Sequence, residues 1–367
     1  MSDSIMPESY QLPFLKMQGL GNDFIFVDAQ KLLQSEARPL LSQWLAVVPQ
    51  LARRLCHRRL SIGADGLILA MSLDSEEMRQ MAVSLYGNYA RDCHLSWTYH
   101  NNEGSQAHMC GNGLRCLALW AKLEKNMSGE IKVATQIGPV TINLIDDDNI
   151  TVILSSPKLN SKDIPFVTPN LQEKQIVRHP FAIDGLQFPI TCVNVGNPHC
   201  LIFEGSFLKP ELFRAFDKEL PVTAQSLEAG QDFFPQELRS LARNIETDKR
   251  FPERTNVHFV RVLDRCHIQV FVWERGCGPT LASGSAAMAA VIAGVLEGRL
   301  DRQVNVTLPG GTLHIEWLAD DHIKMTGAAT FSFRGQIKIK GAQLKAAGKD
   351  KAKIGDAGPL PAKASAL

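Results

Sequence analysis

Two short segments of the chain repeat one pattern but carry different reactive side chains. The first is Met109-Cys110-Gly111-Asn112-Gly113-Leu114-Arg115-Cys116, and the second is Ala282-Ser283-Gly284-Ser285-Ala286-Ala287. In each, a small polar side chain and a glycine precede an apolar run typical of a buried helix. A site repeated in two halves of a chain predicts one active centre built from both. One copy offers a thiol and the other a hydroxyl, so their proton chemistry differs.

Cys110 is the stronger candidate for an acid/base group. The start of a helix presents unpaired N–H groups and the positive end of its dipole, which favour an anion. That anion is either a substrate carboxylate or the thiolate itself, whose pKa we expect to be lowered toward neutrality. The alternative for Cys110 is a small buried apolar side chain. For Ser283 the alternative is a helix N-cap, which explains a hydroxyl without catalysis.

Polar residues elsewhere could complete a binding site for an amino acid. Asparagine is common in turns, so each asparagine alone indicates little. Together with an acidic and a basic neighbour they could hold a carboxylate and an ammonium group. This set consists of Asn22, Asn101, Asn197, Asn256, Glu274 and Arg275. His199 follows Pro198 in a predicted tight turn, where a structural role is the alternative.

Composition sets the class of protein. The chain has 367 residues and a net charge of +1, which gives no indication of nucleic-acid binding. The longest apolar run, 286–296, is too short to cross a bilayer, and no signal peptide is recognisable. The eight cysteines form no CxxC pair or zinc spacing. We therefore expect a cytoplasmic protein with free thiols that binds no metal, nucleic acid or membrane.

The hydrophobic pattern predicts the elements around these residues. Helical spacing follows both repeated sites, at 114–121 and at 284–297, and 30–60 and 205–250 also look partly helical. Strands are predicted at 141–145, 151–155, 256–262, 267–273, 304–308 and 312–317. The result is an α+β fold in which strands surround a central helix, twice.

With these residues the chain resembles the diaminopimelate epimerase family. Members of this family are isomerases of lysine and peptidoglycan-precursor biosynthesis that work without pyridoxal phosphate. Six ordered motifs across about 13–340 carry the resemblance. Besides the segment around Cys110, they are Lys16-Met17-Gln18-Gly19-Leu20-Gly21-Asn22-Asp23-Phe24, Gly63-Ala64-Asp65-Gly66, Gly196-Asn197-Pro198-His199-Cys200, Phe251-Pro252-Glu253-Arg254-Thr255-Asn256 and Trp273-Glu274-Arg275-Gly276.

The resemblance implies two pseudo-symmetric domains, each a β-barrel-like sheet around a central helix, with the active site between them. The boundaries it suggests are a loose leader (1–12), an N-terminal domain (13–154 plus 329–340), a C-terminal domain (155–328) and a disordered tail (341–367). It further implies a homodimer and a cofactor-free reaction on diaminopimelate, in which two cysteines act on opposite faces of the α-carbon.

The family's roles map onto this chain residue by residue. Cys110 would be one acid/base, and Ser283 stands where the family has its second cysteine. The side chains of Asn22, Asn101, Asn197, Asn256, Glu274 and Arg275 would bind substrate, as would the backbone N–H groups of Gly111, Asn112, Gly284 and Ser285. His199 and Glu274 would tune the pKa of the reacting groups. Further departures from the family pattern are Gly66, Gln106 and Ala286.

The serine leaves three functional hypotheses. A hydroxyl is a poor base near pH 7, so the first is a slowed or asymmetric epimerase in which Cys110 abstracts the proton. The second is a one-base isomerase or racemase for another amino acid. The third is a protein that binds an amino acid without converting it. Cys277, six residues before Ser283 across a turn, is not expected to replace the missing thiol.

Overall fold

The computed structural model describes residues 9–33, 41–107, 109–167, 174–205, 220–222 and 232–340. Its first strand already begins at Ser9, so the expected loose leader of residues 1–12 is wrong for residues 9–12. The rest of that leader and the expected tail from residue 341 lie outside the described residues.

The first half of the molecule contains nine strands. They are β1 (Ser9–Gly19), β2 (Asn22–Asp28), β3 (Gly66–Ser72), β4 (Leu95–Asn101), β5 (Gln106–Ala107), β6 (Gly129–Thr135), β7 (Gly138–Leu144), β8 (Ile150–Leu154) and β18 (Thr330–Lys340). Its helices are α1 (Ala29–Leu33), α2 (Leu41–Leu55), α3 (Glu76–Tyr86) and α4 (Gly111–Lys125), with a 3-10 turn at Asn88–Asp92.

The second half follows in the chain. Its strands are β9 (Ile176–Ile183), β10 (Leu186–Asn194), β11 (Pro198–Phe203), β12 (Asn256–Asp264), β13 (His267–Glu274), β14 (Gly278–Thr280), β15 (Gln303–Leu308), β16 (Gly311–Trp317) and β17 (Ile323–Gly327). Within its described residues the helices are α7 (Gln236–Glu246) and α8 (Gly284–Leu296), after a 3-10 turn at Ser161–Asp163. Pro198 and His199 open β11 and are not part of the turn in which the sequence placed them.

The two halves repeat one pairing scheme. In the first half, β1 pairs antiparallel with β2, β2 parallel with β3, β3 antiparallel with β4, and β4 parallel with β6, after which β6, β7 and β8 are antiparallel. The second half has the same alternation through β10, β11, β12, β13, β15, β16 and β17. The internal duplication that the two sites suggested therefore extends to the whole sheet.

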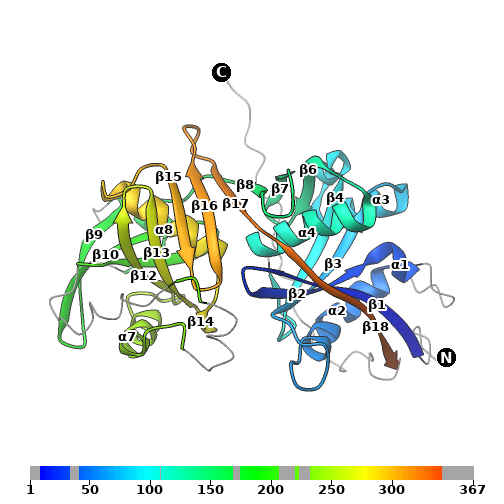
Figure 1. The fold of residues 1–367 in the computed structure, drawn as a ribbon, viewed down its shortest axis with the longest axis horizontal. Coiled ribbons are helices and arrows are strands. Elements are labelled where there is room, and N and C mark those ends of the chain that lie inside the picture. Colours follow the sequence, from blue (N-terminus) through cyan, green and yellow to red (C-terminus); the bar gives the residue numbers. More distant parts are fainter. Residues whose placement is uncertain are drawn as a thin grey trace.

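One helix lies inside the curved sheet of each half: α4 in the first and α8 in the second (Figure 1). Each crosses from one strand to the next parallel strand, between β4 and β6 and between β13 and β15. Leu114, Leu117, Ala118 and Ala121 of α4 are buried, as the helical spacing predicted. α8 is apolar on every side, the composition expected of a fully enclosed helix.

A second layer of helices covers the outside of each sheet. In the first half, α2 packs against β3 and β4 and α3 against β6, in a cluster in which Trp44 is fully buried. In the second half, α7 lies against the outer face of β10 to β13, where Phe234 and Phe259 are in edge contact.

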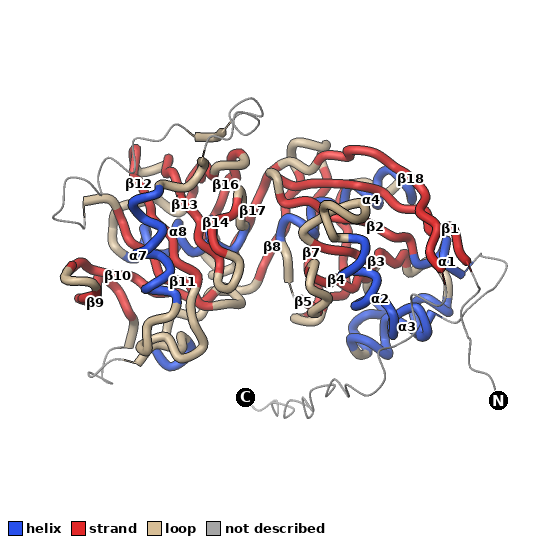
Figure 2. The backbone as a smooth tube through the Cα atoms, turned by 90° about the horizontal axis from the view of Figure 1, so that it is seen from below, coloured by secondary structure: helices blue, strands red, loops and turns tan. Residues whose placement is uncertain are grey.

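A single sheet joins the halves. β8 of the first half pairs antiparallel with β17 of the second, from Ile150 opposite Gly327 to Leu154 opposite Ile323. β18 then returns the chain to the first half and pairs antiparallel along β1 (Figures 1 and 2).

Met325 of β17 packs between the starts of the two central helices. A Cβ on Gly111, the first residue of α4, would lie 2.4 Å from Met325 Cε, and one on Gly284, the first residue of α8, would lie 2.8 Å from its Sδ. Both helices therefore need glycine to approach this side chain, which brings their N-termini to the same place.

We predict that Met325→Ala lowers the free energy of unfolding by about 2–5 kcal/mol, because it leaves a cavity between the two helix starts. Met325→Leu conserves the volume, and its loss should stay below about 1.5 kcal/mol. Urea unfolding followed by tryptophan fluorescence measures both. Equal losses for the two variants would show that filling this gap is not what stabilises the junction.

Candidate active site

Cys110 is the N-cap of α4. Its backbone is extended (φ −152°, ψ 108°), and its Sγ accepts a hydrogen bond from the backbone N–H of Gly113 at 3.4 Å. The thiol donates in turn toward Asn22 Oδ1 at 3.8 Å. The side chain is partly buried and lies at the positive end of the helix, where an anion is favoured.

The expected depression of the Cys110 pKa is wrong for the ligand-free protein. The pKa of this thiol is raised to about 11, chiefly by burial and also by the negative charge of the nearby Glu274 carboxylate. Hydrogen bonds from the backbone N–H groups of Gly113 and Asn112 and the charge of Arg115 act in the predicted direction but are outweighed. Position in a helix can be predicted from sequence; desolvation by the other half of the molecule cannot.

A buried cation lies beneath Cys110. Arg115 is fully buried on α4, and although burial lowers its pKa to about 10, it stays charged at neutral pH. Its Nη2 donates to Asn112 Oδ1 at 2.8 Å, and Asn112 Nδ2 donates to Asn22 Oδ1 at 3.2 Å. The role of Arg115 was missed although the residue lies within the motif, because nothing in the sequence shows that its side chain is buried.

Asn22 is fixed from its other side by a group of charges. Its Nδ2 donates to Asp65 Oδ2 at 2.7 Å, and Arg58 binds Asp65 Oδ1 at 2.7 Å. Burial alone would raise the pKa of Asp23, but hydrogen bonds from Arg58 and Lys16 hold it below its ordinary value. Asp65 belongs to the Gly63-Ala64-Asp65-Gly66 motif, which was the available signal for this positioning role.

Ser283 occupies the equivalent position on α8. It is the N-cap with an extended backbone (φ −141°, ψ 118°), and its Oγ accepts from the backbone N–H of Ala286 at 3.4 Å. Ser285 Oγ lies 3.2 Å from Ser283 Oγ. Ser283 is thus an N-cap, as the alternative interpretation predicted, and the thiol of Cys110 caps α4 with the same geometry. Capping therefore does not decide between a structural and a catalytic role.

Glu274 links the two N-caps. It ends β13 nine residues before Ser283, as Asn101 ends β4 nine residues before Cys110. Thr280 Oγ1 donates a hydrogen bond to its carboxylate at 3.2 Å, and both this hydroxyl and that of Ser283 act to lower the pKa of Glu274. Burial nevertheless raises the Glu274 pKa, and the charge of Asp65 from the first half adds to this. Because Glu274 also influences the Cys110 thiol, residues of both halves meet at one site.

The remaining predicted residues of the second half form a connected group. Asn256 Nδ2 donates to the carbonyl of Pro198 at 2.8 Å, and its Oδ1 accepts from the backbone N–H of Arg275 at 3.0 Å. His199 is fully buried, with Nε2 2.7 Å from Asn197 Oδ1 and Nδ1 2.7 Å from His258 Nε2. His258 was not singled out in the sequence, since nothing marks it within a strand.

Three further positions that the sequence singled out are Asn101, Cys277 and Gly66. Asn101 Nδ2 donates to Ser105 Oγ at 2.9 Å, inside its own turn, and within the described residues no contact joins it to Cys110. Cys277 is exposed. A Cβ on Gly66 would lie 2.4 Å from Tyr99 Cε2, so the Tyr99 ring fills the space that a larger residue there would need.

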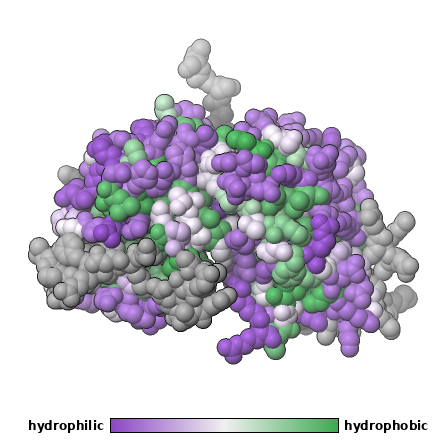
Figure 3. All heavy atoms as spheres, in the orientation of Figure 1, coloured by the Kyte–Doolittle hydropathy of each residue, from purple (hydrophilic) through white to green (hydrophobic). Residues whose placement is uncertain are grey.

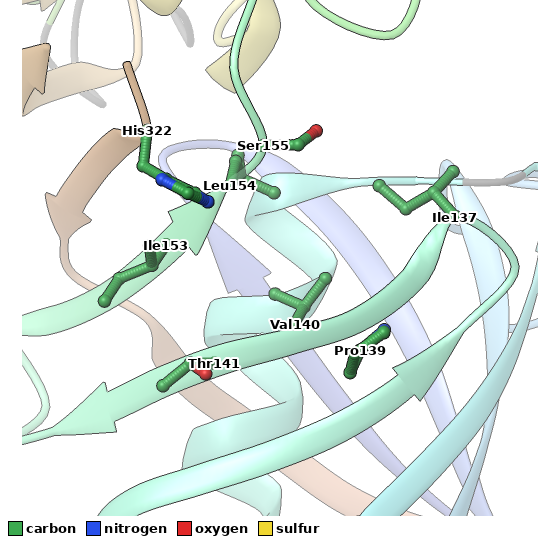
Figure 4. Close-up of a pocket in the computed structure, with 8 residues that line it drawn as sticks. All are labelled: Ile137, Pro139, Val140, Thr141, Ile153, Leu154, Ser155 and His322. Carbon is green, nitrogen blue, oxygen red and sulfur yellow. The ribbon is translucent and has the colours of Figure 1, made fainter. Parts of the chain in front are cut away.

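A pocket elsewhere on the surface is lined by residues of a different kind. It encloses about 170 Å³ at the ends of β7 and β8 and contains none of the candidate residues (Figure 4). Its lining is Ile137, Pro139, Val140, Thr141, Ile153, Leu154, Ser155 and His322. This lining has no charged acid or nucleophilic thiol that would suit it to the same chemistry.

The exterior gives no sign of membrane insertion by helices. Figure 3 shows mainly hydrophilic residues on one face, with hydrophobic residues in smaller patches. In the part of the chain that the structure describes, no helix is both long enough and apolar enough to span a bilayer. Within the same residues, no group of three or more His, Cys, Asp or Glu side chains is arranged to hold a metal ion.

The fold is that of a class of two-domain α+β proteins of known structure. A hydroxyproline epimerase from Agrobacterium vitis matches with a TM-score of 0.54 at 10% sequence identity, covering 90% of this chain and 93% of its own. A protein of the phenazine-biosynthesis PhzF family from Bacillus anthracis matches with a TM-score of 0.52 at 13% identity, covering 89% and 99%. At such identities the likeness concerns the fold alone.

Sequence similarity narrows the class to one family. The diaminopimelate epimerase family model matches residues 14–159 and 191–332. Diaminopimelate epimerases of Picosynechococcus and of Desulfitobacterium hafniense are 37% and 34% identical, over 89% of this chain and 99% and 98% of theirs. The chloroplastic enzyme of Oryza sativa is 37% identical over 88% of this chain and 79% of its own. The chain therefore belongs to the diaminopimelate epimerase family and is an isomerase.

We predict that Cys110 resists alkylation near neutral pH. Only the thiolate reacts with iodoacetamide, and a pKa of about 11 leaves the thiol protonated at pH 7.5. The rate should rise about tenfold per pH unit as the fraction of thiolate grows. Peptide mass spectrometry after timed labelling measures this, with the exposed Cys266 as the internal reference. A rate that levels off below pH 8 would contradict the raised pKa.

Proposed function

We propose that the protein interconverts LL- and meso-diaminopimelate by removing and returning the α-proton, without pyridoxal phosphate. The observation that carries this proposal is the matched pair of N-caps, Cys110 and Ser283, at two helix starts packed on one methionine. The family and its relatives' names supply the substrate. We further propose that the protein works in the cytoplasm as a homodimer in amino-acid biosynthesis.

The reacting end of the substrate would bind between the helix starts. Its α-carboxylate would accept hydrogen bonds from the backbone N–H groups of Gly111, Asn112, Gly284 and Ser285. Asn22, Asn101, Asn197 and Asn256 would add side-chain contacts, and Glu274 and Arg275 would bind the ammonium and carboxylate ends. Helix dipoles directed at the carboxylate stabilise the negative charge that spreads into it when the α-proton leaves.

The two sides of this site differ in charge, which supports an asymmetric reaction. Arg115 lies five residues after Cys110, whereas Met288 lies five residues after Ser283 in α8. The cation therefore favours a thiolate at Cys110, although the Glu274 carboxylate opposes it in the ligand-free protein, and α8 offers Ser283 no corresponding cation at this position. In this proposal Cys110 is the base that abstracts the proton, and Ser283 returns one from the opposite face as a weak acid or through a held water.

The raised pKa of Cys110 restricts when the base can form. A substrate ammonium bound at Glu274 would neutralise the carboxylate that now disfavours the thiolate. The active base would then appear in the complex and not in the ligand-free protein. His199 would influence the same site through Asn197.

The serine also supports two other functions. One is a one-base isomerase or racemase that acts on another amino acid, and the other is a paralogue that binds an amino acid without turnover. Both rest on the absence of a second thiol at position 283. A positioned acid/base contributes about 10²–10⁴-fold to the rate, so its loss is a large effect.

Solvent deuterium distinguishes the three functions. With LL- or meso-diaminopimelate in D₂O, we expect deuterium at the α-carbon together with epimerisation, and neither in Cys110→Ala. Exchange without epimerisation would indicate a single working base. Absence of exchange with either isomer would favour the binding protein, and a stronger thermal stabilisation by another amino acid would identify a different substrate.

We predict that Ser283→Cys raises the turnover number by about 100-fold or more, because a thiol is a far stronger acid than a hydroxyl. Steady-state kinetics in both directions measure the change, and Ser283→Ala is the control for the contribution of the hydroxyl itself. A rate for Ser283→Cys at or below that of the wild type would count against the placement of this residue opposite Cys110.

A further inference from the structure

A chain of three polar side chains runs through the second half behind the candidate site. His258 Nε2 lies 2.7 Å from His199 Nδ1, and His199 Nε2 lies 2.7 Å from Asn197 Oδ1. Both imidazoles are fully buried, whereas Asn197 at the outer end is only partly buried. His258 and Asn256 are two residues apart on β12, so the same face of this strand supplies a predicted substrate ligand and the inner end of the chain.

The direction of these hydrogen bonds follows from one unpaired atom. His258 Nδ1 is buried and, within the described residues, has no hydrogen-bond partner. If His258 Nε2–H donates to His199, this orphan atom is a bare lone pair. If His199 Nδ1–H donated to His258 Nε2 instead, His258 Nδ1 would carry the proton and would be a buried N–H group without an acceptor. Proteins avoid such unpaired donors more strictly than unpaired acceptors. The protons therefore lie on Nε2 of both histidines, and Asn197 Oδ1 accepts.

This direction has a consequence for Asn197. Its oxygen is occupied by His199, and its Nδ2 makes no hydrogen bond to the described residues. One lone pair of this oxygen is already used and the oxygen side of the amide is held at His199, so the capacity left for a ligand lies chiefly in the two N–H donors. Such donors suit a carboxylate oxygen better than an ammonium group. Both nitrogens of His199 are also engaged, so this ring has no free site with which to exchange a substrate proton.

We propose that His258 is a positioning residue: it fixes the Nε2–H tautomer of His199 and thereby turns the Asn197 amide so that its N–H donors face a substrate carboxylate. The inference rests on the proposed function only in that Asn197 contacts the substrate. It also assigns His199 a positioning role in place of the direct pKa-tuning role that the family resemblance implied.

The tautomers can be tested without any substrate. In protein labelled with ¹⁵N-histidine, the nitrogen spectrum distinguishes protonated from bare ring nitrogens, and loss of signals in His258→Gln and His199→Gln assigns them. We expect Nδ1 bare and Nε2 protonated in both residues of the ligand-free protein. A proton on His199 Nδ1 would overturn the proposal, whatever the protein's substrate.

Kinetics test the consequence for binding. His258→Leu should raise KM for diaminopimelate about tenfold, as expected for a lost donor to a charged group, and should change kcat much less. His258→Gln keeps an N–H at the position of Nε2 and should recover most of the loss. Equal increases in KM for Leu and Gln, with thermal unfolding unchanged, would contradict the positioning role. An inactive wild type with the expected tautomers would refute the proposed function alone.

Discussion

The meeting of two helix N-termini at one place is the constraint on which the rest of the structure depends. Each central helix leaves backbone N–H groups without partners at its start, and both starts pack against Met325. Bringing two positive helix ends together is unfavourable unless an anion or a hydrogen-bond acceptor is present. Cys110 and Ser283 each satisfy one N–H group, and the remaining donors form the cradle that a carboxylate would fill.

The two halves repeat the same arrangement of strands and helix caps around this site, but their charged side chains differ. The strand pairings of the two halves correspond one to one, as do the N-caps and the strand ends nine residues before them. The charges do not. Arg115 is buried under the thiol, while Met288 has the corresponding place under the hydroxyl, where Glu274 supplies negative charge instead. The two halves thus share a symmetric scaffold, and in the proposed reaction their side-chain differences would suit the two faces to different halves of one proton exchange.

The sequence predicts what is local and periodic. Helical spacing located α4 and α8, alternation located β7, β8, β12, β13, β15 and β16, and small polar residues before the helices located both caps. The features that could not be predicted depend on contacts between residues that are far apart in the sequence. The direction of the Cys110 pKa shift is set by burial against the other half, and the role of His258 exists only because β11 and β12 place it beside His199. Arg115 gives the same lesson, since its burial and its contact with Met325 link residues far apart in sequence.

The pairing of β18 with β1 has a consequence for how the chain must be assembled. Leu12 lies opposite Ile337, so an edge of the first half is covered only by residues that are made after the whole second half. Until then β1 presents an open strand edge, which is a template for unwanted association. The second half, contained within one continuous stretch, can form first, although domains usually fold from the N-terminus onward. On the ribosome, the half that carries Cys110 is therefore completed only after the whole second half has been made, and β1 keeps its open edge throughout that interval.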